Sequence, residues 1–388
     1  MRADQFLPSA PGQLAPTVSG AVAFVPDPAP RTLPLHGTLA RLNGLAERRL
    51  GELTGAAGRV VNPHLVSAPL LRQEALLSSR IEGTLATPEQ LAMIEVGSPA
   101  VTPDAGEVNN FVRATQHALT RLADGDVIAG PLLRDAHRIM MHGVRGDRER
   151  PGEFRDAQNF IGSSLDIHSA RFVPPPPLQI GSLMADLERY LHDELPVMPD
   201  LVRAAIAHYQ FETIHPFRDG NGRIGRLLIT LLLVRDGLLP GPLLPLSVAI
   251  ERRRTEYTDL MLAVSTHGAW EPWLRFFLEC VIEAAQLALG QVNGLIDLRE
   301  AWRARFLSAR ASALLLKLVD ELFQSPALTI KGVSALLSVT AATASDRLRD
   351  LEKAGIVTEV TGRVRDRVYL APDILRFIGG GAAIPRST

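Results

Sequence analysis

Apolar side chains recur at spacings of three and four residues along most of the chain between Glu107 and Leu289. Such spacing gathers them on one face of a helix, where they can be buried against other helices. It predicts helices over residues 107–123, 131–142, 179–193, 199–213, 223–236 and 253–266. The run Phe172–Pro177 cannot be helical because it contains four consecutive prolines. An almost all-α core, from about 107 to 289, with one short extended flap at Ile161–Pro177 is therefore expected.

The chain before this core changes character twice. Residues 1–35 hold seven prolines and no helical period, which predicts an extended arm that wraps a domain or stays mobile. Residues 36–106 return to helical spacing and include an apolar stretch from Leu70 to Ile81, which Gly83 and Pro88 follow. We expect a helical N-terminal region between the arm and the core.

The chain after the core predicts a smaller domain. A helical linker over 290–308 leads to residues 309–376, which carry three short amphipathic helices and then two alternating stretches typical of a β-hairpin. The helices are expected at 309–323, 331–337 and 341–354, and the strands at 356–360 and 368–371. This order is that of a winged-helix domain, followed by a tail at 377–388. The predicted fold is mainly α throughout.

Composition limits where the chain can act and how it can bind phosphate. No stretch is apolar over the length of a bilayer, and no leader pattern opens the chain, so we expect a soluble, cytoplasmic protein without a membrane partner. The single cysteine, Cys280, allows no intrachain disulfide, which suits a reducing compartment. Every lysine follows residue 316, which excludes a Walker A loop or a protein kinase site before it. Phosphate binding there must use arginine, backbone amides and metal.

The segment His215–Arg226 combines these means of binding phosphate. Its glycines let backbone amides approach a ligand, and the helix that follows adds unpaired N–H groups and a positive dipole end. Arg223 and Arg226 are three residues apart and so share a helical face, from which their guanidinium groups can bind phosphate oxygens. Asp219 offers the hard oxygen that Mg²⁺ prefers. His215 can act as a base near neutral pH.

Each of these features has a simpler interpretation when taken alone. A single histidine at a helix end is more often a structural hydrogen-bonding group, and AspGlyAsnGly is most often a tight turn. ArgXaaXaaArg usually marks a solvated helical face. The order and spacing of all of them within twelve residues favours the functional interpretation.

The segment resembles the Fic-domain signature HxFx(D/E)GNGRxxR, and every fixed position of that signature is met. The resemblance covers roughly residues 107–285 and includes ProGlyGluPheArg at 151–155, GlnAsnPheIleGly at 158–162 and the proline-rich flap. It implies a compact helical domain with a β-hairpin flap. It also implies a protein adenylyltransferase that uses ATP with Mg²⁺.

The resemblance further implies a role for each residue of the segment. His215 would deprotonate a Ser, Thr or Tyr hydroxyl of a protein target, possibly the chain itself, for attack on the α-phosphate of ATP. Asp219 would hold Mg²⁺, and Phe217 would be a buried anchor. Gly220, Asn221 and Gly222 would line the anion hole, and Arg223 and Arg226 would bind the outer phosphates. Tyr257 would lie near the adenine.

A second motif, at Ser78–Gly83, is similar to the (S/T)xxxE(G/N) pattern of Fic proteins that carry an inhibitory helix. Glu82 precedes the glycine that ends a helix, where the helix dipole disfavours a carboxylate. A cationic partner would offset this cost, and we expect Glu82 to pair with Arg226 and block the place of the γ-phosphate. The alternative is a solvated Glu82 with Ser78 facing water. In some similar proteins this glutamate supports removal of AMP, so the direction of the reaction stays open.

The winged-helix domain could bind either DNA or protein. From Thr340 to Leu370, six basic residues face five acidic ones, and the resulting charge of +1 is small for contact with DNA phosphates. Protein docking or homodimer contact is therefore favoured over DNA. The alternatives for the whole chain are transfer or removal of another phosphate-containing group at the same site, and a nucleotide-sensing transcription regulator. A metallohydrolase ranks below them because no HisGluXaaXaaHis spacing occurs.

Overall fold

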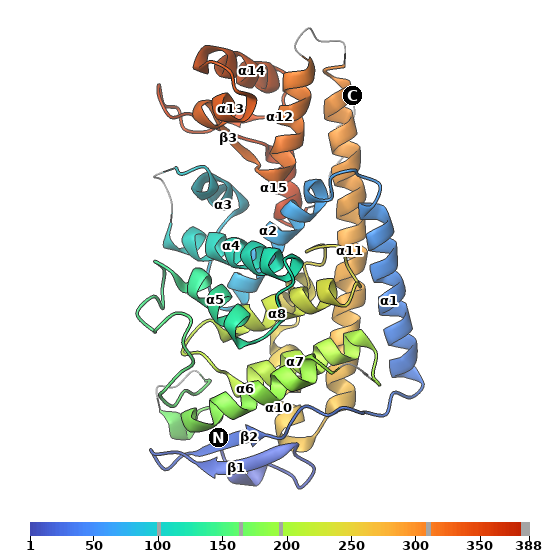
Figure 1. Ribbon diagram of the computed structural model, residues 1–388, viewed down its shortest axis with the longest axis vertical. Coiled ribbons are helices and arrows are strands. Elements are labelled where there is room, and N and C mark those ends of the chain that lie inside the picture. Colours follow the sequence, from blue (N-terminus) through green and yellow to red (C-terminus); the bar gives the residue numbers. More distant parts are fainter. Residues whose placement is uncertain (99–101, 163–165, 194–196, 308–311, 382–388) are drawn as a thin grey trace. The chain divides into compact units, whose positions relative to one another are not determined.

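The computed structural model of the chain is mainly helical, with two small antiparallel sheets among the described residues (Figure 1). It describes residues 1–98, 102–162, 166–193, 197–307 and 312–381. Contacts divide the chain into two compact units. The first comprises Met1–Arg49, Arg113–Leu238 and Leu246–Glu283, and the second Leu50–Val112, Leu239–Pro245 and Ala284–Thr388. The units are interleaved along the sequence, and some of their boundaries fall inside helices, in α1 (Thr38–Ala57), α4 (Pro103–Ala123) and α11 (Trp270–Ala304).

The first unit is built around the pair α7 (Asp200–Ile214) and α8 (Asn221–Arg235), which pack directly against each other (Figure 1). Every residue of α7 except Asp200 and Glu212 is buried, including the polar residues Arg203, His208, Gln210 and Thr213. Around the pair lie α5 (Gly130–Met141) against α8 and α6 (Ile180–Leu191) against α7, with α9 (Ser247–Arg252) and α10 (Arg254–His267) following in the chain. The six helices predicted between residues 107 and 266 are confirmed.

The approach of α7 to α8 depends on a residue without a side chain. A Cβ atom on Gly225 of α8 would overlap the Glu212 carboxylate and lie 3.1 Å from the His208 ring, both on α7. The carbonyl of Gly225 accepts a hydrogen bond of 3.0 Å from Nδ1 of His208. The helix that follows the glycine-containing loop is thereby fixed against the helix that precedes it.

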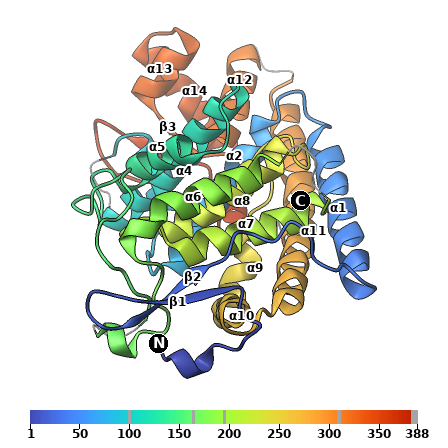
Figure 2. The same cartoon turned by 60° about the horizontal axis from the view of Figure 1, so that its bottom comes forward.

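The N-terminal arm is part of the first unit. After a short 3₁₀ helix, η1 (Ala3–Gln5), it forms an antiparallel hairpin of β1 (Gly12–Pro16) and β2 (Val22–Pro26), seen beside α10 in Figure 2. Phe24 is fully buried between the rings of Phe6 and Phe172, at centroid distances of 5.4 and 6.1 Å. Its backbone N–H donates to the carbonyl of Val173 at 2.9 Å.

The flap is extended but forms little regular sheet. Ile161 and Phe172 exchange two backbone hydrogen bonds, of 2.8 and 3.1 Å, as a single antiparallel bridge. The prolines that follow are not helical until Pro177, which begins the 3₁₀ helix η3 (Pro177–Gln179). A further 3₁₀ turn, η2, spans Ile167–Ser169. The extended flap is thus confirmed, and part of it, residues 163–165, lies outside the described residues.

In the second unit, α2 (His64–Ile81) packs against α12 (Ser312–Gln324) and α15 (Pro372–Ile378), and α3 (Pro88–Glu95) against α15. The buried guanidinium of Arg72 on α2 pairs with the Glu95 carboxylate at 2.9 Å. Burial raises the pKa of Glu95, although Arg72 opposes this shift.

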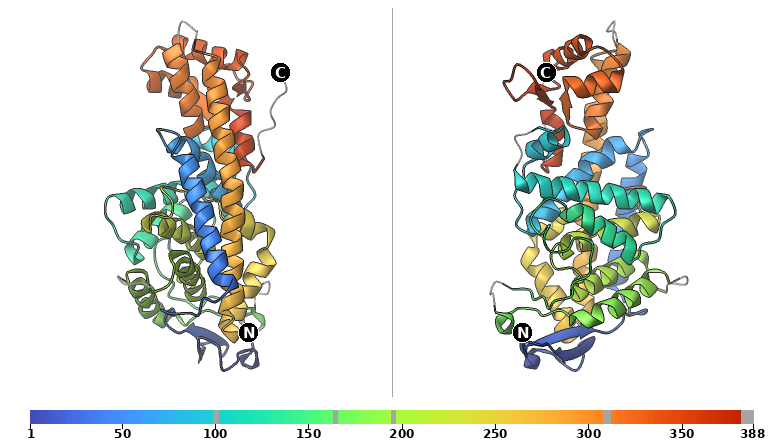
Figure 3. Two further views of the ribbon diagram at one scale, coloured as in Figure 1. Left: turned by 90° about the vertical axis from the view of Figure 1, so that its right-hand side faces the viewer. Right: turned by 60° about the vertical axis from the view of Figure 1, so that its left-hand side comes forward.

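The C-terminal segment has the predicted order of elements. After α12 come α13 (Ile330–Leu337) and α14 (Ala341–Lys353), and a three-stranded sheet in the order β3–β5–β4, drawn in orange to red in Figure 3. Its strands are β3 (Ala327–Thr329), β4 (Thr358–Glu359) and β5 (Val368–Leu370), of which β3 was not predicted. Parts of the predicted linker, domain and tail, residues 308–311 and 382–388, lie outside the described residues.

Two further properties follow from the helices. Among the described residues, none of the helices combines the length and the apolar character needed to cross a membrane. Cys280, on α11, is fully buried, and burial raises the pKa of its thiol to about 12.

Candidate active site

His215 follows the last residue of α7 and has a left-handed backbone conformation, with φ 52°. Its N–H still donates to the Phe211 carbonyl, at 3.0 Å, so the helix ends where the signature begins. The ring Nδ1 lies 3.2 Å from the Glu212 carbonyl and therefore carries the proton that this acceptor requires. In this tautomer the basic lone pair of the imidazole is on Nε2.

The loop between His215 and α8 is closed by a pair of reciprocal hydrogen bonds. Asn221 accepts from the Phe217 N–H through Oδ1 and donates to the Phe217 carbonyl through Nδ2, both at 2.8 Å. Gly220, with φ 77°, is the N-cap that precedes α8, and a Cβ there would lie 2.9 Å from the Met141 sulfur. The N–H of Ile224 donates to the Gly220 carbonyl in the first hydrogen bond of α8. The N–H groups of the three residues before Ile224 therefore have no acceptor within the helix.

His137, on α5, supports this loop by contacting the Phe217 ring and the Asp219 carbonyl. Its ring stacks on the buried ring of Phe217 at a centroid distance of 3.9 Å. The Gly152 N–H donates to Nδ1 at 2.8 Å, so Nε2 carries the proton and donates to the Asp219 carbonyl at 2.9 Å. Burial lowers the pKa of His137 to about 4, which agrees with a neutral ring.

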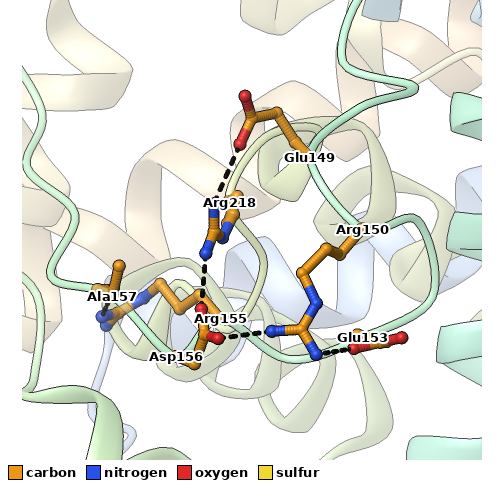
Figure 4. Close-up of polar contacts among 7 residues, drawn as sticks. All are labelled: Glu149, Arg150, Glu153, Arg155, Asp156, Ala157 and Arg218. Atoms are coloured by element: carbon orange, nitrogen blue, oxygen red, sulfur yellow. Dashed lines mark hydrogen bonds and ion pairs between the residues drawn. The ribbon is translucent and has the colours of Figure 1, made fainter.

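Arg155 joins the end of α7 to the flap. It is buried, and its guanidinium donates to the carbonyls of His215 at 2.8 Å and Pro175 at 2.6 Å. It also donates to the Ala157 carbonyl at 3.1 Å (Figure 4). Its own N–H donates to the Pro216 carbonyl at 2.8 Å. A cation is favourable at a helix C-terminus, where the last carbonyls need donors. Burial nevertheless lowers the pKa of Arg155 to about 10.

An exposed ionic network fastens the middle of the loop (Figure 4). Arg218 contacts Asp156 at 2.5 Å and Glu149 at 3.3 Å, while Arg150 pairs with both Asp156 and Glu153. The hydrogen bond from Arg218 lowers the pKa of Asp156. The network therefore ties the loop to the segment that carries Arg155.

The two arginines of the signature lie on α8 and are buried. Arg223 and Arg226 are 1% and 3% exposed, and Nη2 of Arg223 lies 3.4 Å from the Met141 sulfur. Tyr257, expected beside the adenine, is also buried; its hydroxyl lies 2.7 Å from Nε2 of His208, and its ring packs with Trp273. Burial lowers the pKa of His208 to about 3. The structure gives Tyr257 a position in the core, and its contact with adenine stays a prediction.

Asp219 lines a cavity of about 640 Å³ together with the loop Gly143–Glu149. Its Oδ1 accepts a hydrogen bond of 2.7 Å from the Gly220 N–H. Within the described ranges, no three His, Cys, Asp or Glu side chains gather in a way that could hold a metal on their own. A single carboxylate beside an open volume nonetheless suits Mg²⁺, which takes one or two protein oxygens and completes its shell with water and phosphate.

The second motif lies on α2, in the other unit. The helix ends at Ile81, and Glu82 and Gly83, with φ 89°, follow it, so the predicted helix end is confirmed. Ser78 is fully buried, so the alternative in which it faces water is wrong. Glu82 is exposed, and its N–H donates to the Ser79 carbonyl at 3.1 Å.

Sequence reasoning missed the residues that support the loop from outside the signature. His137 lies on an amphipathic helix where a lone histidine carries no signal, and Asp156 and Glu149 look like ordinary surface acids. Asn159, whose Nδ2 donates to the Arg218 carbonyl at 3.0 Å, and Arg155 lie in the two stretches that resemble the family. The resemblance marked these two positions without indicating their contacts.

Comparison with known proteins agrees with this geometry. Residues 130–233 match the Fic/DOC family, and residues 40–120 match the Fic/DOC family N-terminal region. A protein adenylyltransferase Fic from Culex quinquefasciatus is 30% identical over 272 residues, which are 66% of this chain and 51% of that protein. One from Aedes aegypti is 34% identical over 178 residues, 45% of this chain and 32% of that protein. The chain thus spans about half, or less, of the length of these relatives.

Solved structures share the fold. The crystal structure of a Fic family protein from Desulfovibrio desulfuricans G20 superposes with a TM-score of 0.55 at 23% identity, and covers 88% of this chain and 98% of that one. A Fic domain containing signaling protein from Bacteroides thetaiotaomicron gives a TM-score of 0.51 at 18% identity, over 64% of this chain and 97% of that one. From the matched regions and the complete signature, this chain belongs to the Fic/DOC family and carries the family's N-terminal region ahead of its Fic domain.

Proposed function

We propose that the chain is a protein adenylyltransferase that moves AMP from ATP to a Ser, Thr or Tyr hydroxyl of a protein. One observation carries this proposal. The Nδ1–H of His215 is bonded to the Glu212 carbonyl, which makes Nε2 the basic nitrogen of the ring. The same loop places the first amides of α8 a few residues later, through the Asn221–Phe217 hydrogen bonds.

In this mechanism the chain supplies a base and a cradle for charge. Nε2 of His215 takes the hydroxyl proton as the target oxygen bonds to the α-phosphorus. The bond from that phosphorus to the bridging oxygen breaks, and pyrophosphate leaves with the electron pair. The N–H groups of Asn221 and Gly222 meet the negative charge on the α-phosphate, while Arg223 and Arg226 bind the outer phosphates. A magnesium ion on Asp219 would add positive charge beside the phosphates.

We further propose that Glu82 inhibits this reaction by pairing with Arg226. Loss of the guanidinium from the γ-phosphate would leave ATP bound weakly or in a geometry that does not react. The argument rests on charge: Arg226 is 3% exposed, and an anionic partner, either a carboxylate or a phosphate, stabilises a buried guanidinium.

The test compares the wild-type protein with Glu82→Gly and His215→Ala in a cell extract, using ATP labelled at the α or the γ position. We expect α-label on protein, more of it with Glu82→Gly, and none with His215→Ala. Because the transition-state interactions of a general base are worth roughly 10²–10⁴-fold, the last loss should be complete within detection.

The labels also separate the alternatives. Retention of γ-label would point to phosphate transfer and contradict AMP transfer. Equal labelling by wild type and Glu82→Gly would remove the inhibitory role of Glu82 while leaving the transferase activity in place.

A further inference from the structure

The side chain of Arg218 reaches toward a neighbouring segment, although a carboxylate stands next to it in the chain. Its guanidinium contacts Asp156 at 2.5 Å and Glu149 at 3.3 Å (Figure 4). In the part of the chain that the structure describes, no ion pair joins Arg218 to Asp219. Oδ1 of Asp219 instead accepts the Gly220 N–H.

An adjacent arginine and aspartate can pair, and another pair in this chain does so. Arg235 and Asp236 form two hydrogen bonds, of 2.7 and 2.9 Å, between neighbouring side chains. The same contact between Arg218 and Asp219 would place a guanidinium on the carboxylate that faces the 640 Å³ cavity. A cation already bound there would compete with a metal ion for the same oxygen atoms.

We propose that Glu149 and Asp156 act as a latch that withdraws Arg218 from Asp219 and so keeps this carboxylate available to the Mg²⁺ that accompanies a nucleotide. The inference rests on the proposed function, because it assigns positioning residues to the same site. Glu149 lines the cavity and Asp156 does not, and in this proposal both act through Arg218.

The charge balance of the network favours the latched state. Three carboxylates, on Glu149, Glu153 and Asp156, share two guanidinium groups, on Arg150 and Arg218. Arg218 therefore meets two carboxylates on the latch and would meet one at Asp219. Removal of both latch carboxylates would leave Asp219 as its nearest anion along the chain.

The first test is structural and needs no nucleotide. A crystal structure of the full chain with Glu149→Gln and Asp156→Asn should show the Arg218 guanidinium on the Asp219 carboxylate. A guanidinium that stays on the latch side, or that extends into solvent, would overturn the proposal.

The second test measures binding by calorimetry. Mg²⁺·ATP is titrated into the full chain carrying Glu82→Gly and His215→Ala, which keeps the site uninhibited and prevents turnover. Adding Glu149→Gln and Asp156→Asn should weaken binding about two- to fivefold, the range of a single half-exposed ion pair. Adding Arg218→Gln to that protein should restore most of the affinity, since the competing cation is then gone.

The controls separate the latch from a structural effect and from failure of the proposed function. Glu153→Gln removes a carboxylate of the same network that does not contact Arg218, and it should leave affinity unchanged. If Arg218→Gln weakens binding further, the latch is overturned but the proposed function is not. The same holds if the affinity is equal with and without the carboxylates of Glu149 and Asp156. Absence of binding heat in the parent protein as well would remove the proposed function itself.

Discussion

The signature loop depends on a buried group that must stay in one protonation state. His137 accepts from the Gly152 N–H through Nδ1 and donates to the Asp219 carbonyl through Nε2, so a second proton has no acceptor. Protonation would break the first of these bonds and charge a ring stacked on Phe217. The shape of the loop therefore depends on the neutrality of a residue that has no part in the chemistry.

This dependence predicts a loss of stability in acid. Because burial lowers the pKa of His137 from 6.5 to about 4, the unfolded chain takes up a proton first as the pH falls. Stability is full above pH 6.5 and declines toward pH 4, by at most about 3 kcal/mol from this residue. His137→Gln keeps a donor and an acceptor but does not titrate, so its unfolding free energy should vary less across that window.

The comparison needs a matched histidine and a correction for a second buried one. His117→Gln, at a half-buried position on α4, serves as the control for loss of a histidine that does not contact the loop. Part of the slope will remain in every variant because burial also lowers the pKa of His208, to about 3. An unchanged slope in His137→Gln, measured by urea denaturation at pH 7, 6, 5 and 4, would contradict the assignment.

Among the helices and strands, the contact of α7 with α8 determines the geometry of the site, because the signature loop connects them. The sequence predicted both helices from apolar spacing, and the loop from its glycines. It did not predict the hairpin β1–β2, since prolines at residues 8, 11, 16, 26 and 28 suggest a chain without pairing partners. Val22–Pro26 pairs because Phe24 gains a buried site between Phe6 and Phe172, a contact far apart in sequence.

The close packing of α7 and α8 predicts a large effect from one added methyl group. Gly225→Ala places a Cβ on the Glu212 carboxylate and the His208 ring, and we expect a loss of about 1–3 kcal/mol of unfolding free energy. Gly181→Ala, in the exposed first turn of α6, meets nothing within 4 Å and should change stability little or raise it. Thermal denaturation of both variants checks this contrast. Equal midpoints for the two would show that the helices do not depend on Gly225.

For the whole molecule, the sequence predicted the kinds of element better than their grouping. The spacing of apolar residues predicts contiguous regions that begin at residues 36, 107 and 290. The compact units are not contiguous, and some of their boundaries lie inside α1, α4 and α11. Local patterns report the local helix, and they carry no information on which distant residues pack around it. For the same reason the sequence identified the signature, which is local, but not the contacts that Glu149 and Asp156 make with Arg218.

The charge on α14 bears on what the C-terminal segment can bind. Arg347 pairs with Asp350 at 3.0 Å, and Arg349 pairs with Asp346 at 2.9 Å, so both guanidinium groups are already engaged on their own helix. We expect only weak binding of random duplex DNA, lost in a gel shift as salt rises to about 0.2 M. Asp346→Asn with Asp350→Asn should strengthen it. A shift by the wild-type protein that persists at that salt would contradict this expectation.

The inert thiol inside α11 makes the chain convenient for spectroscopy. Cys280 is buried and protonated at working pH, so maleimide dyes should not react with it. Cysteines introduced for labelling therefore do not require that Cys280 be replaced first. Val18, at the hairpin tip, and Leu178, after the proline run, are fully exposed and accept such dyes without touching the core. Energy transfer between the two dyes would show in real time whether the N-terminal arm and the flap move apart when a substrate binds.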